Sequence, residues 1–355
     1  MKIAYIVPSL QPTGPIILVQ SLSKYLGECG CDIDIYYFDG NTKKLDFTCN
    51  THQIAFSEPI DFDSYDIVHS HCFRSDLFVN KHKKLIHRAK TLSTLHQDTY
   101  MSFTYDYCKP LAYFLTVYWL HVQSKNDRVV AISNQLRDSY QARLKGKAVT
   151  LYNGVDVVNA DKLDELYLNQ IYDLKQKGYK LLGTCAKVVK RKGISQVLLA
   201  LKELPNHAFV IIGDGSEKNV LMQLASKLGV DDRVLFLPHV DTPYNYLEDI
   251  DVYMMTSYSE GFGLAMVEAA LKGKAIVCSN IPSFHEIFNE TEACFFELDN
   301  ISSLIGAIDD AYKKKDVLSH NAQEKATKLF TAEKMAERHM QLYEQLISET
   351  KSVVK

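Results

Sequence analysis

The sequence has no large excess of charge and no long hydrophobic run. Its formal net charge is −3 over 355 residues, which gives no reason to expect a nucleic-acid partner. Residues 110–124 form an uncharged, strongly apolar stretch of fifteen residues. As a helix this stretch would span about 22 Å, whereas a membrane-spanning helix needs roughly 20 residues. The first apolar run, MKIAYIVPSL, is too short for a signal peptide. These absences predict a cytoplasmic protein without a membrane-spanning segment.

Paired cysteines and other metal-binding patterns are also missing. The eight cysteines show no C-x2-C spacing, so reduced thiols are expected rather than a zinc site. Residues 61–63 (DFD) and 249–251 (DID) have the spacing of an Asp-x-Asp metal motif, but each leads into a predicted strand and is interpreted as a turn. His69 and His71 lie two apart on a predicted strand and therefore point the same way, yet no third ligand accompanies them. We predict no metal site, and we expect the two histidines at a strand end or in an acceptor cleft.

The sequence does contain a regular alternation of short apolar strands and helical patterns. This alternation predicts βαβ units and therefore parallel sheets covered on both faces. It restarts after a polar stretch at 156–178, which gives an α/β fold of two doubly wound, Rossmann-like domains, 1–160 and 178–332. Ligands bind at the carboxyl ends of strands in such sheets, so we expect the functional residues on loops of a cleft between the domains. The predicted strands are 2–9, 31–38, 65–71, 89–96, 128–133, 148–155, 179–188, 207–215, 233–240, 252–257 and 274–280.

Two acids flank a glycine turn in the segment TSYSEGFGLAMVEAALKG, which follows the predicted strand DVYMM. The helix is expected to begin near Gly263 and to end at Gly273, a glycine in the usual C-terminal position. Glu260 then precedes the helix, and Glu268 lies about one and a half turns inside it. Free N–H groups at a helix N-terminus form a natural phosphate site, which would bring Glu268 near a ribose diol and Glu260 near the group that the phosphate carries. The alternative is a solvated acid followed by an ordinary helical acid.

A basic loop follows the first strand of the second domain. In the segment AKVVKRKG, Lys187 and Lys192 lie five apart and enclose Lys190 and Arg191. Cations at the carboxyl end of a strand, opposite a phosphate-ready helix, could neutralise a diphosphate. A solvated basic face is the alternative interpretation.

Several short motifs occur in a fixed order along the chain. They are DIVHSH at 66–71, TLH at 94–96, VVAIS at 129–133, NGVD at 153–156, GDG at 213–215, SEGFG at 259–263, and the E-x7-E spacing of Glu260 and Glu268. Together they resemble the family 4 glycosyltransferases, which have the GT-B fold, and the resemblance covers nearly the whole chain. It implies transfer of a sugar from a nucleotide diphosphate to an acceptor with retention of the anomeric configuration. The leaving phosphate is expected to help deprotonate the acceptor.

The resemblance also implies a role for each matching residue. Glu268 resembles the acid that holds the ribose hydroxyls, and Glu260 resembles the acid near the donor sugar. Phe262, Gly263 and Leu264 match the loop whose backbone contacts sugar and phosphate, and Lys187 and Lys192 match the basic pair on the diphosphate. His96 matches the first-domain histidine that faces the donor sugar, and Gly14 matches the glycine loop after the first strand. We expect Glu260, His96 and Lys192 to be catalytic.

Three positions depart from the pattern of the family. The basic pair usually begins with arginine, and Lys187 keeps the charge but loses the bidentate geometry. The early loop usually has two glycines, whereas the segment TGP leaves only Gly14. His239 lies near a usual glycine and either touches the base or caps a loop. The last helix, 335–355, resembles the family helix that crosses back to the first domain.

The expected donor is a nucleotide-linked hexose or N-acetylhexosamine, with UDP as the first candidate and GDP-mannose as the second. No metal or other cofactor is expected. The expected acceptor is a glycan or a lipid-linked saccharide, as in bacterial surface-polysaccharide assembly. A basic run at 81–90 and crowded aromatics at 100–119 suggest that 81–125 contacts an anionic bilayer at the inner face of the cell membrane. A solvated helix face and ordinary core packing are the alternatives.

Three other functions fit parts of the same pattern. A nucleotide-sugar epimerase of the same fold would need no acceptor, and a silent partner subunit of a transferase would need no chemistry. A catalytically silent subunit is disfavoured, because the matching residues Glu260, Glu268, Lys192 and His96 are all present. A nicotinamide dehydrogenase is suggested by the G-x-G at 213–215, but the third glycine of that fingerprint is missing.

Overall fold

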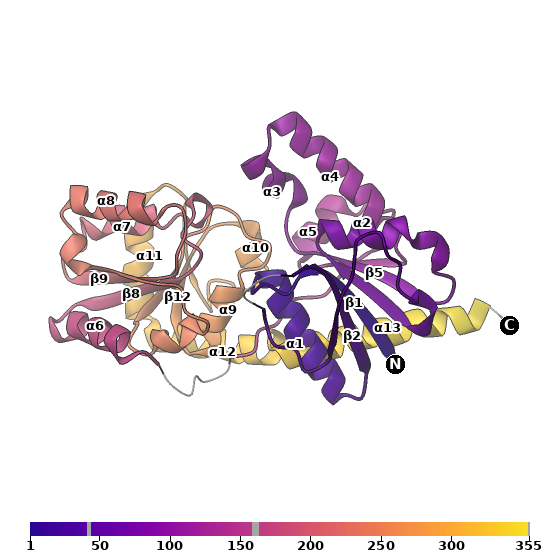
Figure 1. Ribbon diagram of the computed structural model, residues 1–355. Helices are drawn as coiled ribbons and strands as arrows, with labels where there is room; N and C mark the ends of the chain where they lie inside the picture. Colours follow the sequence, from indigo (N-terminus) through magenta and orange to yellow (C-terminus); the bar gives the residue numbers. More distant parts are fainter. Residues whose placement is uncertain (41–43, 158–162, 354–355) are drawn as a thin grey trace. The chain divides into compact units, whose positions relative to one another are not determined.

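The computed structural model describes residues 1–40, 44–157 and 163–353 (Figure 1). The chain forms two compact units. Unit 1 contains Met1–Val155 together with Phe330–Lys355, and unit 2 contains Asp156–Leu329. Unit 1 is therefore discontinuous, because the chain leaves it after Val155 and returns at Phe330. The predicted domain boundary at residue 160 and the end of the predicted last helix, 354–355, lie outside the described residues.

Unit 1 is built on a seven-stranded sheet in the order β3-β2-β1-β4-β5-β6-β7, and all its strand pairs are parallel. The strands β1 and β4 in its middle are largely buried, as a sheet covered on both faces requires, although β4 carries the polar residues His69, Ser70 and His71. The polar edge strand β3, with the sequence NTHQ, is exposed throughout and was not predicted. The strands are β1 (Lys2–Ser9), β2 (Asp32–Asp39), β3 (Asn50–Gln53), β4 (Ile67–His71), β5 (Lys90–Leu95), β6 (Arg128–Ala131) and β7 (Ala148–Thr150).

The helices of unit 1 include the end of the chain. The final helix α13 packs against α1, and its Tyr343 is buried, with its hydroxyl 3.0 Å from the hydroxyl of Tyr5 on β1. The sheet of unit 1 is thus covered in part by a helix from the C-terminal part of the sequence. The helices are α1 (Gly14–Glu28), α2 (Phe73–Lys81), α3 (Thr99–Asp106), α4 (Lys109–Gln123), α5 (Asn134–Tyr140) and α13 (Ala332–Val353).

Unit 2 has a six-stranded sheet in the order β10-β9-β8-β11-β12-β13, again with every pair parallel. The segment between β10 and β11, which has a helical sequence pattern at 242–250, forms only a 3-10 turn at Pro243–Leu247. The strands are β8 (Lys180–Cys185), β9 (His207–Ile212), β10 (Val234–Leu237), β11 (Val252–Met255), β12 (Ala275–Ser279) and β13 (Cys294–Phe296). The helices are α6 (Glu165–Gln176), α7 (Ser195–Leu201), α8 (Lys218–Leu228), α9 (Leu264–Leu271), α10 (Pro282–His285), α11 (Ile301–Lys313) and α12 (Lys315–Leu329).

Both sheets reverse their strand order once, and this reversal fixes where a ligand can bind. The predicted fold class, two doubly wound parallel sheets, is confirmed. In unit 1 the order turns between β1 and β4, and in unit 2 it turns between β8 and β11. The loops that leave the carboxyl ends of such neighbouring strands diverge to opposite faces and open a crevice, which is the usual ligand site of an open α/β sheet.

One surface feature of unit 1 is unusual for packed helices. Large apolar side chains are exposed along α3 and α4, and Phe114 is 69% exposed. The remaining members of this surface are Met101, Tyr105, Tyr107, Leu111, Tyr113 and Tyr118. Within the described ranges, none of the helices combines the length and the hydropathy that crossing a membrane demands.

Candidate functional site

The loops that follow β8 and β11 are joined to each other at the reversal point of the unit 2 sheet. The backbone N–H of Tyr258 donates to the carbonyl of Arg191 at 2.9 Å, and the hydroxyl of Thr256 donates to the carbonyl of Lys192 at 3.0 Å. Gly193 makes this approach feasible, because its φ is +60° and a Cβ there would lie 2.1 Å from the carbonyl oxygen of Thr256. The local fold therefore requires glycine at this position.

Glu260 lies at the centre of an ion-pair cluster formed by these two loops. Its Oε1 accepts hydrogen bonds from Lys192 Nζ at 2.5 Å and from Ser257 Oγ at 2.7 Å, and its Oε2 lies 3.1 Å from Arg191 Nη1. The Glu260 side chain is only 10% exposed. Burial alone would raise the pKa of this carboxyl, but the charges of Lys192 and Arg191 hold the pKa below its ordinary value. Glu260 is therefore ionised at neutral pH.

Glu268 has the opposite environment. It lies on α9, and burial raises the pKa of its carboxyl to about 7, although the charge of Lys192 acts to lower it. Among the described residues, no side chain or backbone group forms a hydrogen bond with this carboxyl. A half-buried carboxyl with unused acceptor oxygens can bind a pair of hydroxyl groups, because each of its oxygens can accept one hydrogen bond. Lys192 thus acts electrostatically on both acids of the E-x7-E motif.

The start of α9 has the geometry that the sequence predicted. Gly263 is the N-cap with φ +89°, a conformation that favours glycine, and a Cβ there would lie 3.0 Å from the ring of Phe284. The side chain of Phe262 is buried, and Leu264 is the first helical residue. Gly273 follows the helix with φ +66°. The free N–H groups of this helix end lie directly after the Glu260 loop.

The basic loop is divided between two kinds of environment. Lys192 and Arg191 belong to the ion-pair cluster, whereas Lys187 is exposed. The GDG motif supports the base of this loop, because Cβ atoms at Gly213 and Gly215 would lie 2.0 and 2.1 Å from the carbonyl oxygens of Ala186 and Val188. The loop carrying the cations is thus held by close backbone packing that excludes side chains.

His239 lies on the neighbouring loop after β10. Its backbone N–H donates to Asp214 at 3.3 Å, and its ring is 60% exposed. The other oxygen of the Asp214 carboxylate pairs with Lys218 at 2.9 Å. In the structure His239 therefore closes a loop through its backbone, and its ring makes only a 3.9 Å contact with Asp241.

In unit 1, the predicted residues lie near the corresponding reversal point. His96 follows β5, and its Nε2 lies 2.9 Å from Nδ1 of His71, the last residue of β4. Burial and the neighbouring His339 lower the pKa of His96 to about 3, so its ring is neutral at pH 7. Gly14 is the first residue of α1, directly after the β1 loop, and a Cβ there would meet nothing within 4 Å. The fold of the free chain does not require glycine at that position.

The structure brings some predicted residues into contact and adds others. Glu260 and Lys192 are directly paired, and Glu268 lies within the electrostatic influence of Lys192. Arg191 was predicted only as a loop cation, and Ser257 and His71 were not assigned roles in the site. The signals were present, because Ser257 precedes Glu260 by three residues and His71 ends the H-x-H strand. What the sequence lacked was the pairing of loops that lie 68 residues apart.

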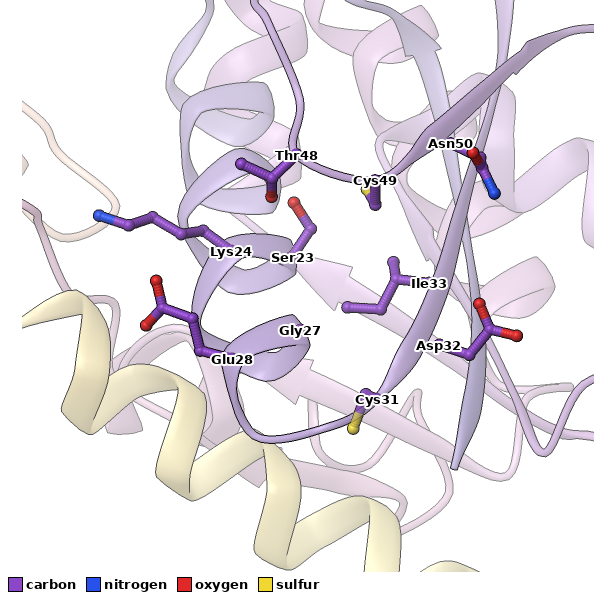
Figure 2. A pocket seen from close by; sticks show the side chains of 10 residues that line it. All are labelled: Ser23, Lys24, Gly27, Glu28, Cys31, Asp32, Ile33, Thr48, Cys49 and Asn50. Atoms are coloured by element: carbon purple, nitrogen blue, oxygen red, sulfur yellow. The ribbon is translucent and has the colours of Figure 1, made fainter.

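Unit 1 also contains a pocket that lies away from the predicted site residues. A pocket of about 530 Å³ lies between the end of α1 and the starts of β2 and β3, with Cys31, Ile33 and Cys49 on its strand side (Figure 2). It is at the amino ends of the strands, and none of the predicted site residues line it.

Over the described ranges, no group of three or more histidine, cysteine or acidic side chains is arranged to hold a metal.

The two Asp-x-Asp segments serve the backbone. Asp63 accepts hydrogen bonds from the N–H groups of His87 and Arg88. Asp251 accepts from the N–H of Leu181 and pairs with Lys315 at 2.7 Å. Their interpretation as turns that lead into strands agrees with these contacts.

Comparisons with known proteins show what the two units are similar to. Residues 51–159 match the family model described as Glycosyltransferase Family 4, and residues 172–329 match the model described as Glycosyl transferases group 1. The O-antigen biosynthesis glycosyltransferase WclY of Escherichia coli is 28% identical over 98% of this chain and 99% of its own length. The E. coli UDP-Gal:alpha-D-GlcNAc-diphosphoundecaprenol alpha-1,3-galactosyltransferase is 24% identical over 79% of this chain and 76% of its own. The fold is similar to that of Anabaena HepE in complex with UDP-glucose, with a TM-score of 0.77 and 19% identity over 99% and 100% of the two chains.

Proposed function

Because this chain belongs to glycosyltransferase family 4 and has the two parallel-sheet domains of the GT-B architecture, we propose that it is a retaining transferase that uses a UDP-linked sugar. The transferred group is a hexose or an N-acetylhexosamine, and the acceptor is a glycan or a lipid-linked saccharide. The observation that carries the proposal is the site of unit 2. There Lys192 is paired with the ionised Glu260 and also acts electrostatically on Glu268, whose carboxyl has unused acceptor oxygens.

The roles follow from this arrangement. Glu268 accepts hydrogen bonds from the ribose hydroxyls, and the N–H groups at the start of α9 bind the phosphates together with Lys187 and Lys192. Glu260 lies near the donor sugar. Phe262, Gly263 and Leu264 contribute backbone contacts. Since HepE has been solved with UDP-glucose and the galactosyltransferase relative is named for UDP-Gal, UDP is favoured over GDP-mannose as the donor nucleotide.

In the proposed reaction the acceptor approaches the face of the sugar from which the nucleotide leaves. The bond between the anomeric carbon and the phosphate oxygen breaks, and a bond from that carbon to the acceptor oxygen forms. The acceptor proton passes to the departing phosphate oxygen. The negative charge that develops on the phosphate is stabilised by Lys187, Lys192 and the N-terminal end of α9. The family resemblance further assigns Gly14 to the phosphate and His96 to the donor sugar. These fixed cations are the reason to expect that the transfer needs no metal.

The proposed biological setting is assembly of a bacterial surface polysaccharide. The WclY relative is named for O-antigen biosynthesis, and the galactosyltransferase relative is named for a diphosphoundecaprenol substrate. A lipid-linked acceptor is presented at a membrane, so we expect the protein to work in the cytoplasm and to contact the inner face of the cell membrane.

We propose that only part of the segment 81–125 forms the expected membrane surface. The basic run at 81–90 precedes the start of β5, whereas the exposed aromatics of α3 and of the first part of α4 follow its end (Figure 1). Lys83 donates to Thr91 at 2.7 Å and is therefore partly tied to the sheet. We accordingly assign membrane contact to the exposed apolar surface of α3 and α4. Tyrosine-rich helical surfaces suit the interface between lipid headgroups and acyl chains.

Liposome flotation tests this assignment. Wild type and a Tyr113→Ser, Phe114→Ser double variant would be mixed with vesicles that contain anionic lipid. The wild type should float and the variant should not, whereas a Lys84→Ser variant in the basic run should behave as wild type. Failure of the intact wild type to float would contradict the membrane proposal without affecting the transferase proposal.

Thermal unfolding with nucleotides tests the donor site. UDP, GDP, ADP and CMP would each be added with and without magnesium to wild type and to Glu268→Ala. A ligand at 100 times its dissociation constant adds roughly 2.7 kcal/mol of stability. We expect UDP to stabilise the wild type without magnesium and to have little effect on the variant. If no nucleotide stabilises either protein, the proposal is wrong.

Product analysis with UDP-sugars then separates the reaction classes. A transferred sugar supports the proposal. An epimerised free sugar would instead identify the epimerase alternative, and nucleotide binding without any product would identify a silent partner subunit.

A further inference from the structure

A layer of histidine and tyrosine side chains lies behind His96 in unit 1. His69 and His71 project from the same face of β4, with ring centroids 4.4 Å apart, and the ring of Tyr5 lies 5.7 Å from each of them. His69, His71 and Tyr5 are almost fully buried. Only His71 of this layer reaches the predicted site residue, through its 2.9 Å contact with His96.

His69 has a partner for each of its ring nitrogens. Its Nδ1 lies 2.7 Å from the hydroxyl of Tyr343 on α13, and its Nε2 lies 2.8 Å from the hydroxyl of Thr94 on β5. His71 differs, because its Nδ1 is bonded to His96 while its buried Nε2 has no hydrogen-bond partner among the residues that the structure describes. This difference makes the proton position on His71 deducible.

Both histidines of the pair are neutral at pH 7. Burial and the neighbouring histidines depress the pKa values of His71 and His96, and no acidic side chain is among the groups that shift them. A neutral imidazole has one N–H and one acceptor nitrogen. The bond between them must therefore be donated by one ring and accepted by the other.

The unpaired Nε2 of His71 decides which of the two rings donates the hydrogen bond. If His96 donated from Nε2, the proton of His71 would be on its own Nε2, which would be a buried N–H with no acceptor. If His71 donates from Nδ1, its Nε2 is only a buried lone pair. Unpaired buried N–H groups are rarer in proteins than unpaired acceptors. The second arrangement is thus favoured, and it leaves the proton of His96 on Nδ1.

We propose that His71 is a positioning residue that holds His96 as an Nδ1–H donor, aimed at an oxygen of the transferred sugar. This inference rests on the proposed function, in which His96 faces the donor sugar. It makes His96 a hydrogen-bond donor in the ground state rather than a general base. It also explains why the H-x-H strand ends at the reversal point, since the backbone of β4 fixes the ring that fixes His96.

The proton position can be measured directly in the free protein. Histidine labelled with nitrogen-15 in the ring distinguishes protonated from unprotonated nitrogens by NMR, and a His96→Gln variant identifies the His96 signals. We expect wild-type His96 to carry its proton on Nδ1 and not on Nε2. A proton on Nε2 of His96 in the wild type would overturn the proposal, whatever the variants do.

Two variants test the consequence for the sugar. His71→Leu removes the donor, whereas His71→Asn places an amide N–H donor near the position of Nδ1. UDP and the UDP-sugar that most stabilises the wild type, chosen among UDP-glucose, UDP-galactose and UDP-GlcNAc, would be titrated into each. We expect His71→Leu to lose at least tenfold in affinity for the UDP-sugar and nothing for UDP, with His71→Asn recovering most of the loss.

The outcomes separate this inference from the proposed function. If UDP does not bind the wild type, the proposed function fails while the NMR measurement still decides the proton position. If UDP binds and His71→Leu retains full affinity for the UDP-sugar with an unchanged His96 tautomer, the positioning role is wrong. His87→Leu, at an exposed histidine of the same unit, serves as the matched control.

Discussion

Lys192 and Arg191 are both ion-paired with Glu260 in the free protein, although the proposed donor would bring a diphosphate to the same loop. The diphosphate must therefore compete with Glu260 for these cations. Charge repulsion between Glu260 and the diphosphate is the cost of keeping the two loops paired before the donor arrives.

Replacing Glu260 by glutamine should reveal this competition. Glu260→Gln removes a negative charge within 3.1 Å of Arg191 and 2.5 Å of Lys192, so the local potential becomes more positive. We expect UDP to bind the variant several-fold more tightly than the wild type while sugar transfer is lost. Isothermal titration calorimetry measures the affinity, with Glu203→Gln on the surface of unit 2 as control. Weaker binding of UDP by the variant would contradict the competition.

The ionisation of Glu268 predicts a pH dependence. Its pKa in the free protein is about 7, and the ionised carboxylate accepts hydrogen bonds from two hydroxyls, whereas the protonated acid accepts less well. Binding of a ribose diol then lowers this pKa, so affinity for UDP should rise as the pH increases from about 6 to about 8. Glu268→Gln should weaken binding roughly 10- to 100-fold, as expected for a hydrogen bond to a charged group, and should lose the part of the pH dependence that is specific to Glu268. A pH profile identical in both proteins would exclude Glu268 as its source.

The loop after β8 requires glycine at position 193, because there is no space for a Cβ atom. Gly193→Ala would place a methyl group 2.1 Å from the carbonyl oxygen of Thr256 in addition to forcing a left-handed conformation on alanine. We expect a large loss of melting temperature and loss of UDP binding. Gly229→Ala at the end of α8 is a matched control, since its φ is +68° but its Cβ would meet nothing within 4 Å. That variant should lose only about 1–2 kcal/mol and keep its UDP affinity.

Helices α2 and α4 are joined by one buried carboxyl. Asp76 on α2 accepts hydrogen bonds from Trp119 at 2.6 Å and Gln123 at 3.2 Å on α4, and from Ser70 at 2.5 Å. Burial raises its pKa to about 6. Since the raised folded pKa means that the native state holds the proton more tightly than the unfolded chain, this group favours the folded state below about pH 4, and that contribution is lost as the pH rises to 6.

Replacing Trp119 by phenylalanine tests this connection, because an aromatic ring is kept while the N–H donor is removed. Trp119→Phe should lower the free energy of unfolding by about 1–3 kcal/mol at about pH 8, where Asp76 is ionised. The loss should be smaller at about pH 5, where the carboxyl is protonated. Urea unfolding followed by circular dichroism measures it, with Tyr118→Phe on the exposed side of α4 as control. An equal loss at both pH values would show that the ionised carboxylate is not what Trp119 stabilises.

The sequence predicted the strongly periodic elements and failed where local pattern and tertiary context differ. The strand β3 (Asn50–Gln53) is polar and pairs only at the edge of the sheet, so it carried no apolar signal. The segment after β10 has a helical pattern, but Pro243 and the short connection to β11 limit it to one 3-10 turn. The sequence could not divide the aromatics at 100–119 between the core and the surface, and in the structure only the side of α4 with Trp119 is buried.

The candidate site was predictable to the extent that its residues share one loop. Glu260 and Glu268 lie eight apart on a single strand-turn-helix segment, so their motif is visible in the sequence. The partnership of Glu260 with Lys192 arises because β8 and β11 are neighbours in the sheet, which strand order alone decides. The exposure of Lys187 and the tautomer of His96 depend on packing that no short motif encodes.

Each unit of the whole molecule has its own sheet and core. The core of unit 2 is a continuous cluster that extends from Leu182 on β8 to Ala311 on α11. All the nucleotide contacts proposed here except those of Gly14 and His96 belong to this unit. It is thus a candidate for an independently folding nucleotide-binding module.

Expression of residues 156–329 alone tests this independence. We expect a cooperatively unfolding protein that is stabilised by UDP, but less than the full chain, because Gly14 is missing. Circular dichroism and thermal unfolding with UDP measure both properties. The same fragment carrying Glu268→Ala is the control. An unfolded fragment would show that unit 2 depends on unit 1 for its stability.

The discontinuity of unit 1 affects how the protein can be made. During synthesis the first 155 residues leave the ribosome before unit 2, but α13, which contributes Tyr343 to the buried layer behind β1 and β4, is translated only after unit 2. At roughly 5–20 residues per second, the wait is on the order of ten seconds or more. Unit 1 therefore begins to be synthesised first but is completed only after unit 2. Its sheet lacks the cover of α13 while unit 2 folds.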